Sequence, residues 1–191
     1  MIQYKKYYMP GTKEELLKTI DTIDCTYDIL AGGTDLYAKE KTPFNGADAA
    51  IDISGIKEFS VIKLKKEEGL ITFGSNICIQ QFLEEKVLME NVPILRHAAI
   101  YFADQQIREM ATVGGNVANS SPSGDTIAPL TALEAVIHTI TSKDNKICEK
   151  ETPITEFITG VGKNLLEKGE VISSITCPVL KEYGCAFKKL D

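Results

Sequence analysis

Two glycine-rich motifs carry the residue types that could bind a phosphorylated ligand. The first reads ILAGGTDL over Ile29–Leu36, and the second reads ATVGGNVANSSPSGDTIAPL over Ala111–Leu130. Each runs from apolar or β-branched residues through a glycine pair into small hydroxyl and amide residues. Glycine pairs let backbone N–H groups approach an anion closely because no Cβ stands in the way. Two such motifs in one chain suit a dinucleotide, which carries two phosphates and polar sugars.

The two motifs differ in how specific they are. The Gly32-Gly33 turn matches neither the G-x-G-x-x-G fingerprint nor a P-loop. Taken alone, it is explained more simply as a strand-to-helix turn that Thr34 or Asp35 caps. The second motif predicts a long polar loop, which is uncommon in a compact domain unless it serves a function. Within it, Asp125 is suited either to accept hydrogen bonds from ribose hydroxyls or to cap a helix.

The remaining reactive side chains favour neither a catalytic nor a metal site. His97 and His138 have no neighbouring cysteine or acid in a ligand or triad pattern. The five cysteines are widely spaced and include no C-x-x-C pair. We therefore expect no catalytic residue and no metal ligand in this chain. The absence of a nucleophile and a base is typical of redox proteins in which the cofactor performs the chemistry.

Composition and charge place the chain among ordinary globular proteins. Of its 191 residues, 43% are hydrophobic and 25% are charged, and the formal net charge is −6. An acidic chain argues against nucleic acid as the main partner. No apolar run is long enough to cross a membrane, and the first residues lack a signal-peptide core. We therefore expect a cytoplasmic protein without a membrane partner.

The elements around the first motif can be predicted from capping residues and apolar runs. Thr12-x-x-Glu15 predicts a capping box at the start of a helix. The apolar segments 27–31 and 49–53 predict strands that pack with this helix as a β-α-β unit. A domain boundary is expected near 54–60.

The elements around the second motif predict a different architecture. Ser75 or Asn76 is expected to cap a helix, and Pro93 suits the first position of the next one. The strands and helices expected here are a hairpin of 61–64 with 70–73, a helix over 126–134, a hairpin of 135–141 with 146–149, and a strand over 170–177. Helices segregated from antiparallel strands predict an α+β fold.

These motifs resemble the FAD-binding subunit of the molybdenum hydroxylases, the family of xanthine dehydrogenase, aldehyde oxidase and carbon monoxide dehydrogenase. The resemblance covers essentially all 191 residues, and TVGGNVANSSPSGD is its most specific part. It implies a fold of the PCMH type, in which FAD lies extended between two α+β subdomains. On this basis we expect subdomains at 1–57 and 58–178. Residues 179–191 are then expected to begin a third, C-terminal subdomain that is missing or truncated.

The resemblance also implies which residues bind FAD. The first motif corresponds to the family's pyrophosphate loop, and the segment 112–116 corresponds to a second phosphate-cradling loop. Phe102 corresponds to an aromatic residue near the adenine, and Asp125 to a ribose or adenine contact. The full set of expected FAD-binding residues is Ile29, Leu30, Ala31, Gly32, Gly33, Thr34, Asp35, Leu36, Phe102, Thr112, Val113, Gly114, Gly115, Asn116, Asp125, Ile172 and Lys188.

The resemblance further implies partner chains, because nothing in this sequence is suited to hold molybdenum or iron–sulfur clusters. We expect a large subunit that binds molybdopterin and a small subunit that carries 2Fe–2S clusters. NAD or another acceptor would then take the electrons from FAD. Two alternatives stay open: a stand-alone flavin oxidoreductase of the same fold superfamily, and a nucleotide-binding module without turnover.

Overall fold

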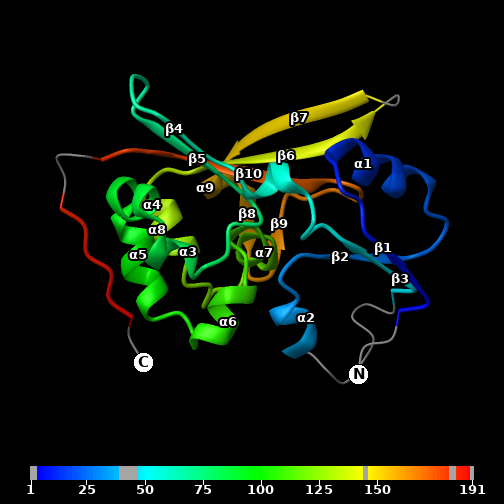
Figure 1. The fold of residues 1–191 in the computed structure, drawn as a ribbon, viewed down its shortest axis with the longest axis horizontal. Helices are drawn as coiled ribbons and strands as arrows, with labels where there is room; N and C mark the ends of the chain where they lie inside the picture. Colours follow the sequence, from blue (N-terminus) through cyan, green and yellow to red (C-terminus); the bar gives the residue numbers. More distant parts are fainter. Residues whose placement is uncertain (1–3, 39–46, 144–145, 181–183, 190–191) are drawn as a thin grey trace.

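Two main sheets and one small hairpin, with helices packed against them, make up this computed structural model (Figure 1). It describes residues 4–38, 47–143, 146–180 and 184–189. The strands are β1 (Lys6–Tyr8), β2 (Tyr27–Leu30), β3 (Ala49–Asp52), β4 (Ile62–Lys65), β5 (Leu70–Gly74), β6 (Val136–Lys143), β7 (Lys146–Pro153), β8 (Ile158–Gly160), β9 (Lys163–Asn164) and β10 (Val171–Pro178). The helices are α1 (Lys13–Thr22), α2 (Thr34–Ala38), the 3-10 helix η2 (Lys57–Ser60), α3 (Gln81–Glu84), α4 (Lys86–Asn91), α5 (Pro93–Ile100), α6 (Gln105–Met110), α7 (Val113–Asn119), α8 (Ile127–Ala132) and α9 (Ile154–Phe157).

The N-terminal sheet has the order β1-β3-β2, and both outer strands run parallel to β3. The predicted strands 27–31 and 49–53 correspond to β2 and β3. Helix α1 connects β2 to β1, a further parallel strand that was not predicted. Its cap, Thr12, accepts a hydrogen bond from the Glu15 amide at 3.2 Å. The Glu15 carboxylate in turn accepts from the amide of Gly11 at 2.7 Å, one residue before the cap. The predicted helix start is therefore confirmed, with the return bond of the capping box shifted by one residue.

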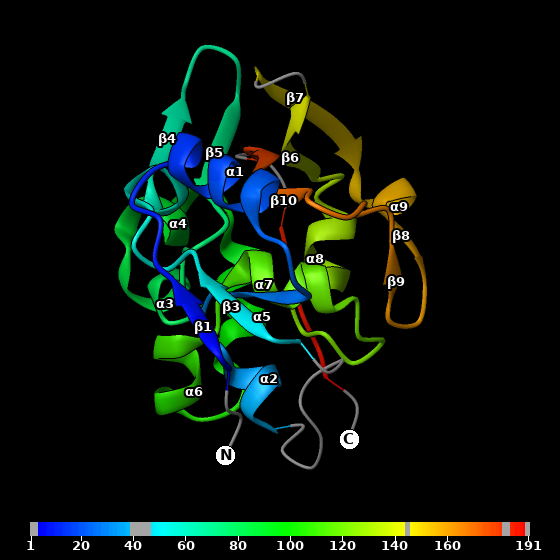
Figure 2. The ribbon, with the colours of Figure 1, turned by 90° about the vertical axis from the view of Figure 1, so that its right-hand side faces the viewer.

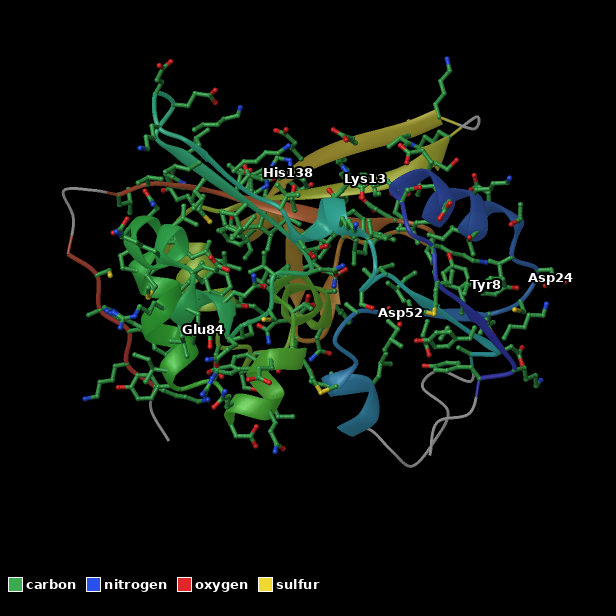
Figure 3. The ribbon with its side chains drawn as sticks, viewed as in Figure 1. Tyr8, Lys13, Asp24, Asp52, Glu84 and His138 are labelled. Carbon is green, nitrogen blue, oxygen red and sulfur yellow. The ribbon has the colours of Figure 1, made fainter. Side chains whose placement is uncertain are left out.

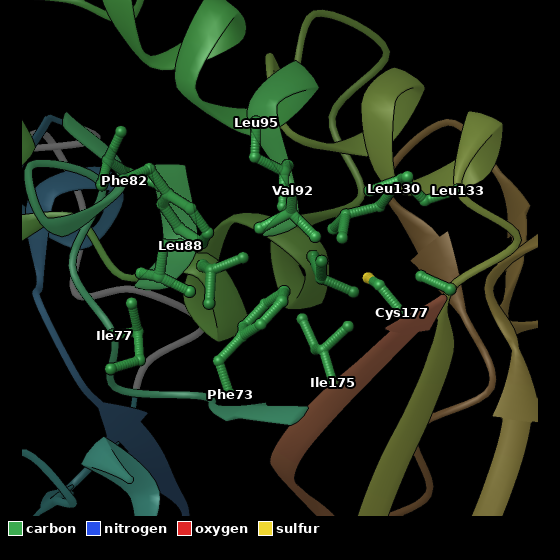
Figure 4. Close-up of a cluster of buried hydrophobic side chains, with 14 of the residues drawn as sticks. Phe73, Ile77, Phe82, Leu88, Val92, Leu95, Leu130, Leu133, Ile175 and Cys177 are labelled. Atoms are coloured by element: carbon green, nitrogen blue, oxygen red, sulfur yellow. The ribbon is translucent and has the colours of Figure 1, made fainter. Parts of the chain in front are cut away.

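The larger sheet is antiparallel and has the order β4-β5-β10-β6-β7. Both predicted hairpins are confirmed, and β10 lies between them. Helices cover one face of this sheet and enclose a large apolar core that includes Phe73, Phe82 and Ile175 (Figure 4). His138 lies on the opposite face, away from these helices (Figure 3). Pro93 opens α5 as predicted.

A second apolar cluster joins the two sheets. It combines Ile51, Ile53 and Phe59, from β3 and the segment that follows it, with Ile140 of β6 and Val171 of β10. Figure 2 views the molecule from the side of the small sheet, with α1 between this sheet and the larger one. The polypeptide crosses from one sheet to the other at η2, where the boundary was expected. The exact limits of the two subdomains stay a prediction.

Two local predictions are wrong. The second glycine motif is not one long loop, because α7 begins at Val113 and runs through both glycines. Neither Ser75 nor Asn76 caps a helix: α3 begins at Gln81, and Asn76 instead donates its side-chain amide to the Ile53 carbonyl at 2.7 Å. Tertiary contacts override local propensity at both places. Among the described ranges, no helix combines the length and the apolar character needed to span a bilayer.

Candidate functional site

A cavity of about 720 Å³ brings the two glycine motifs together. This volume lies in the range typical of small-molecule and cofactor sites. The predicted residues that line it are Ile29, Ala31, Gly32, Gly33, Thr34, Asp35, Leu36, Phe102, Thr112, Gly114, Gly115, Asn116 and Ile172. The cavity therefore unites segments from the small sheet, the large sheet and the helices.

The first motif forms a tight turn between β2 and α2. Gly33 adopts a φ of 69°, a left-handed conformation that glycine tolerates without strain. At Gly32, a Cβ would lie 1.8 Å from the Met110 carbonyl oxygen, so only glycine fits there. Thr34 is the first residue of α2 rather than a residue before the helix. This turn therefore packs directly against the backbone of Met110 and Ala111, where the second motif begins.

The second motif supplies the start of α7. Thr112 caps this helix by accepting a hydrogen bond from the Gly115 amide at 3.1 Å. Gly114 packs against the segment after β5, because a Cβ there would lie 2.5 Å from that of Ser75. Asn116 accepts a hydrogen bond from the Thr126 hydroxyl at 2.6 Å, which ties α7 to the residue before α8. The glycines thus permit close packing of the helix instead of a flexible loop.

Three carboxylates line the cavity, whereas its described lining includes no lysine or arginine. Burial raises the pKa of Asp28, and a hydrogen bond that Tyr4 donates at 2.9 Å partly opposes this shift. Glu170 accepts hydrogen bonds from the Thr139 hydroxyl and from the Glu167 amide. The third carboxylate that lines the cavity is that of Asp35 in the first motif. Phosphates bound here would have to rely on backbone N–H groups and hydroxyls, as the glycine motifs predict.

Four predicted residues do not line the cavity. Leu30 and Val113 are buried within the elements that carry the two motifs. Lys188 is exposed. Asp125 instead pairs with Lys189, whose ammonium lies 2.9 Å from one carboxylate oxygen and 3.1 Å from the other. The expected roles of these residues in binding FAD stay predictions.

Sequence reasoning missed several lining residues. Ser75 and Asn76 follow β5, and Glu170 precedes β10 at the cavity wall. Gly162 reaches the rim through the β8–β9 hairpin, where its amide donates to the Ser120 carbonyl at 2.9 Å. The available signal at 75–76 is a polar pair placed directly after an apolar strand, a pattern that also predicts a helix cap. No cluster of three or more His, Cys, Asp or Glu side chains that could hold a metal occurs in the described ranges.

Comparison with known families gives one extended match. Residues 2–180 match the family described as the FAD binding domain in molybdopterin dehydrogenase. The match includes both glycine motifs and every lining residue of the cavity.

Individual proteins agree with this match. The glyceraldehyde dehydrogenase medium chain of Sulfolobus acidocaldarius is 28% identical over 184 residues, which are 96% of this chain and 63% of the relative. The putative xanthine dehydrogenase FAD-binding subunit of Escherichia coli is 31% identical over 150 residues, or 78% of this chain and 50% of the relative. A solved carbon monoxide dehydrogenase from Hydrogenophaga pseudoflava superposes with a TM-score of 0.90 at 26% identity, covering 100% of this chain and 65% of that chain. The chain thus spans less than two thirds of each of these proteins.

Proposed function

Because the chain belongs to the family of FAD-binding domains of molybdopterin dehydrogenases, we propose that it is the FAD-carrying electron-transfer component of a multi-subunit molybdenum hydroxylase. One observation carries the proposal beyond family membership. The two glycine motifs, far apart in the sequence, line one cavity large enough for a cofactor. FAD is the dinucleotide that suits this arrangement.

The residues present fit an extended dinucleotide. In this proposal the turn at Gly32-Gly33 holds the pyrophosphate through backbone N–H groups, and the Thr112 hydroxyl at the start of α7 adds a further donor. The amides of Val113, Gly114 and Gly115 already donate to the Ile77 carbonyl, the Ser75 carbonyl and the Thr112 hydroxyl, so this part of α7 shapes the cavity wall instead. Phe102 lines the cavity and is only 9% exposed, so it offers an apolar wall to the adenine. Ile172, at the start of β10, is proposed to contact the flavin. Asp125 and Lys188 are proposed as further contacts on the basis of the resemblance.

The protein's part in the chemistry is to bind and orient the cofactor. FAD, when bound, would accept electrons from iron–sulfur clusters and pass them to NAD or to another acceptor. No cysteine or histidine occurs among the described lining residues, so we propose that FAD is held without a covalent bond. The proposed partners are a molybdopterin-binding large subunit and a small subunit with 2Fe–2S clusters, and the proposed location is the cytoplasm.

The test begins with the purified protein, expressed together with its partners. We expect a yellow protein that releases FAD, and not FMN, into the supernatant after acid precipitation. Flavin retained in the pellet would contradict non-covalent binding, and release of FMN would contradict the dinucleotide site. Bleaching of the flavin absorbance by NADH would support NAD as acceptor. Flavin that binds but is never reduced by substrate or by NADH would favour a nucleotide-binding module without turnover.

A further inference from the structure

Two buried polar oxygens in the cavity wall have no hydrogen-bond partner within the described chain. They are the Ser75 hydroxyl oxygen and the Asn76 side-chain carbonyl oxygen. Both residues line the cavity, and Ser75 is only 3% exposed. A buried polar group without a partner costs about 1–3 kcal/mol, so such groups are rare unless a ligand or water completes them.

The surrounding hydrogen bonds fix both residues in place. The Ser75 amide donates to the Ser173 carbonyl at 3.0 Å, and its carbonyl accepts from the Gly114 amide at 2.9 Å. The Asn76 side chain donates its NH₂ group to the Ile53 carbonyl at 2.7 Å. This bond assigns the orientation of the amide, because only the nitrogen can donate to a carbonyl. The oxygen of Asn76 is therefore the atom left for a ligand.

The chemistry of these two atoms indicates which ligand group they bind. An amide oxygen only accepts hydrogen bonds, so its ligand partner must donate one. The neighbouring serine hydroxyl can donate as well as accept. A hydroxyl group, which also donates and accepts, complements this pair, whereas an ionised phosphate only accepts and would repel the Asn76 oxygen.

We propose that Ser75 and Asn76 form a third ligand-binding segment of the cavity and that it recognises a sugar or polyol hydroxyl of the dinucleotide. This inference rests on the proposed FAD function. The position of this segment supports the inference, since Ser75 packs against Gly114 of the second motif and Asn76 donates to the carbonyl of Ile53, directly after β3. The hydroxyl can come from the ribityl chain or from the ribose, and both adjoin the pyrophosphate.

The variant Ser75→Ala separates ligand binding from folding. Removing a hydroxyl that has no partner should leave the melting temperature of the ligand-free protein unchanged or raise it. FAD affinity, measured by titration of the ligand-free protein, should fall about three- to tenfold, the equivalent of one net hydrogen bond. Ser173→Ala is the matched control, because Ser173 is also buried but its hydroxyl donates to the His138 carbonyl at 3.2 Å and does not line the cavity. That variant should lower the melting temperature and leave FAD affinity unchanged.

A competition arm with ADP identifies the source of the hydroxyl. ADP contains the ribose and the pyrophosphate but lacks the ribityl chain. If Ser75→Ala weakens ADP and FAD by the same factor, the ribose is bound; if it weakens FAD alone, the ribityl chain is bound. Equal FAD affinity in the wild type and Ser75→Ala would overturn the inference. A wild-type protein that binds no FAD at all would instead overturn the proposed function, so the two failures are distinguishable.

Discussion

At the scale of single residues, the glycines of the two motifs act mainly by permitting close packing. Gly32 meets the backbone of Met110 and Ala111, and Gly114 meets Ser75. Both contacts join segments distant in sequence, and both lie at the cavity wall. The sequence indicates that glycine is needed at these places but not why, because a local pattern does not show which backbone approaches.

The variant Gly32→Ala tests this packing. The added Cβ would fall 1.8 Å from the Met110 carbonyl oxygen, so the turn must move away from the segment that leads into α7. We expect the free energy of unfolding to fall by about 1–3 kcal/mol, as for other overpacked sites, and FAD affinity to fall with it. Gly55→Ala is the control, since no atom lies within 4 Å of the added Cβ. Urea unfolding measures the stability of both variants, and titration measures their FAD affinity. An equal loss of stability in Gly32→Ala and Gly55→Ala would show that the close approach at Gly32 has no special cost.

The buried carboxyl of Asp28 predicts a dependence of stability on pH. Burial is the main cause that raises its pKa above the usual value of 3.8, against the opposing hydrogen bond from Tyr4. The folded state therefore holds this proton more tightly than the unfolded state. The stabilising contribution of the protonated Asp28 is complete below the pKa that this carboxyl has in the unfolded state. It is lost as the pH rises through the pKa of the folded state. Ionisation of Asp28 at higher pH should thus destabilise the folded protein.

Asp28→Asn should remove this cost, because asparagine keeps an acceptor for Tyr4 but carries no charge. We expect the variant to be more stable than the wild type at pH 7, with a difference that shrinks as the pH falls toward 4. Asp24→Asn is the control of opposite sign: the hydrogen bond from Lys6 is the main cause that lowers the pKa of Asp24, so its removal should not stabilise. Denaturant unfolding of the ligand-free protein at several pH values provides the measurement. A stability gain independent of pH would contradict the assignment to ionisation.

At the scale of elements, caps and apolar runs predicted the structure where local signals act alone. Thr12 and Glu15 marked the start of α1, and Pro93 marked the start of α5. The start of α7 could not be predicted in this way, because a glycine pair lowers helix propensity by about 1 kcal/mol per residue relative to alanine. Packing of Gly114 on Ser75 and the cap at Thr112 stabilise the helix instead.

The cap of α7 should therefore matter for both folding and binding. Thr112→Ala removes the acceptor for the Gly115 amide, and we expect it to cost about 1 kcal/mol of stability and to weaken FAD binding. Thr112→Ser should restore both. Thr12→Ala removes the equivalent cap of α1, away from the cavity lining, and should cost similar stability without changing FAD affinity. Unfolding curves and FAD titrations of the three variants, measured in parallel, separate the effect of the cap on folding from its effect on binding. An unchanged FAD affinity in Thr112→Ala would show that the cap serves folding alone.

At the scale of the whole molecule, the cavity exists because two sheets share a core. Ile140 and Val171 of the larger sheet pack with Ile51 and Phe59, which holds the first motif against the second. The two-part α+β architecture was predictable from hairpin signals and from the resemblance. The lining residues 75 and 76 were not, because their place at the cavity depends on which strands become neighbours: β10 pairs with β5, so the Ser75 amide reaches Ser173.

The C-terminal segment 184–189 connects a late part of the chain to the second motif. Alternate residues of this segment contact the helical layer. The Cys185 Sγ lies 3.8 Å from the His97 Nδ1, and the ring centroids of Phe187 and Tyr101 lie 6.1 Å apart. Lys189 completes the series through its ion pair with Asp125. The resemblance singled out Lys188 as a flavin contact, whereas the structure gives Lys189 the contact with a predicted FAD-binding residue.

Comparison of Lys189→Ala with Lys188→Ala tests which lysine matters. Lys189→Ala leaves the Asp125 carboxylate of the second motif, only 14% exposed, without its cation. We expect weaker FAD binding and faster chymotrypsin cleavage at Phe187, because the segment loses one of its attachments. Lys188→Ala removes the same charge from an exposed position and should change neither. If Lys188→Ala weakens FAD binding more than Lys189→Ala does, the role that the resemblance implied for Lys188 is correct, and the Lys189–Asp125 pair only tethers the segment.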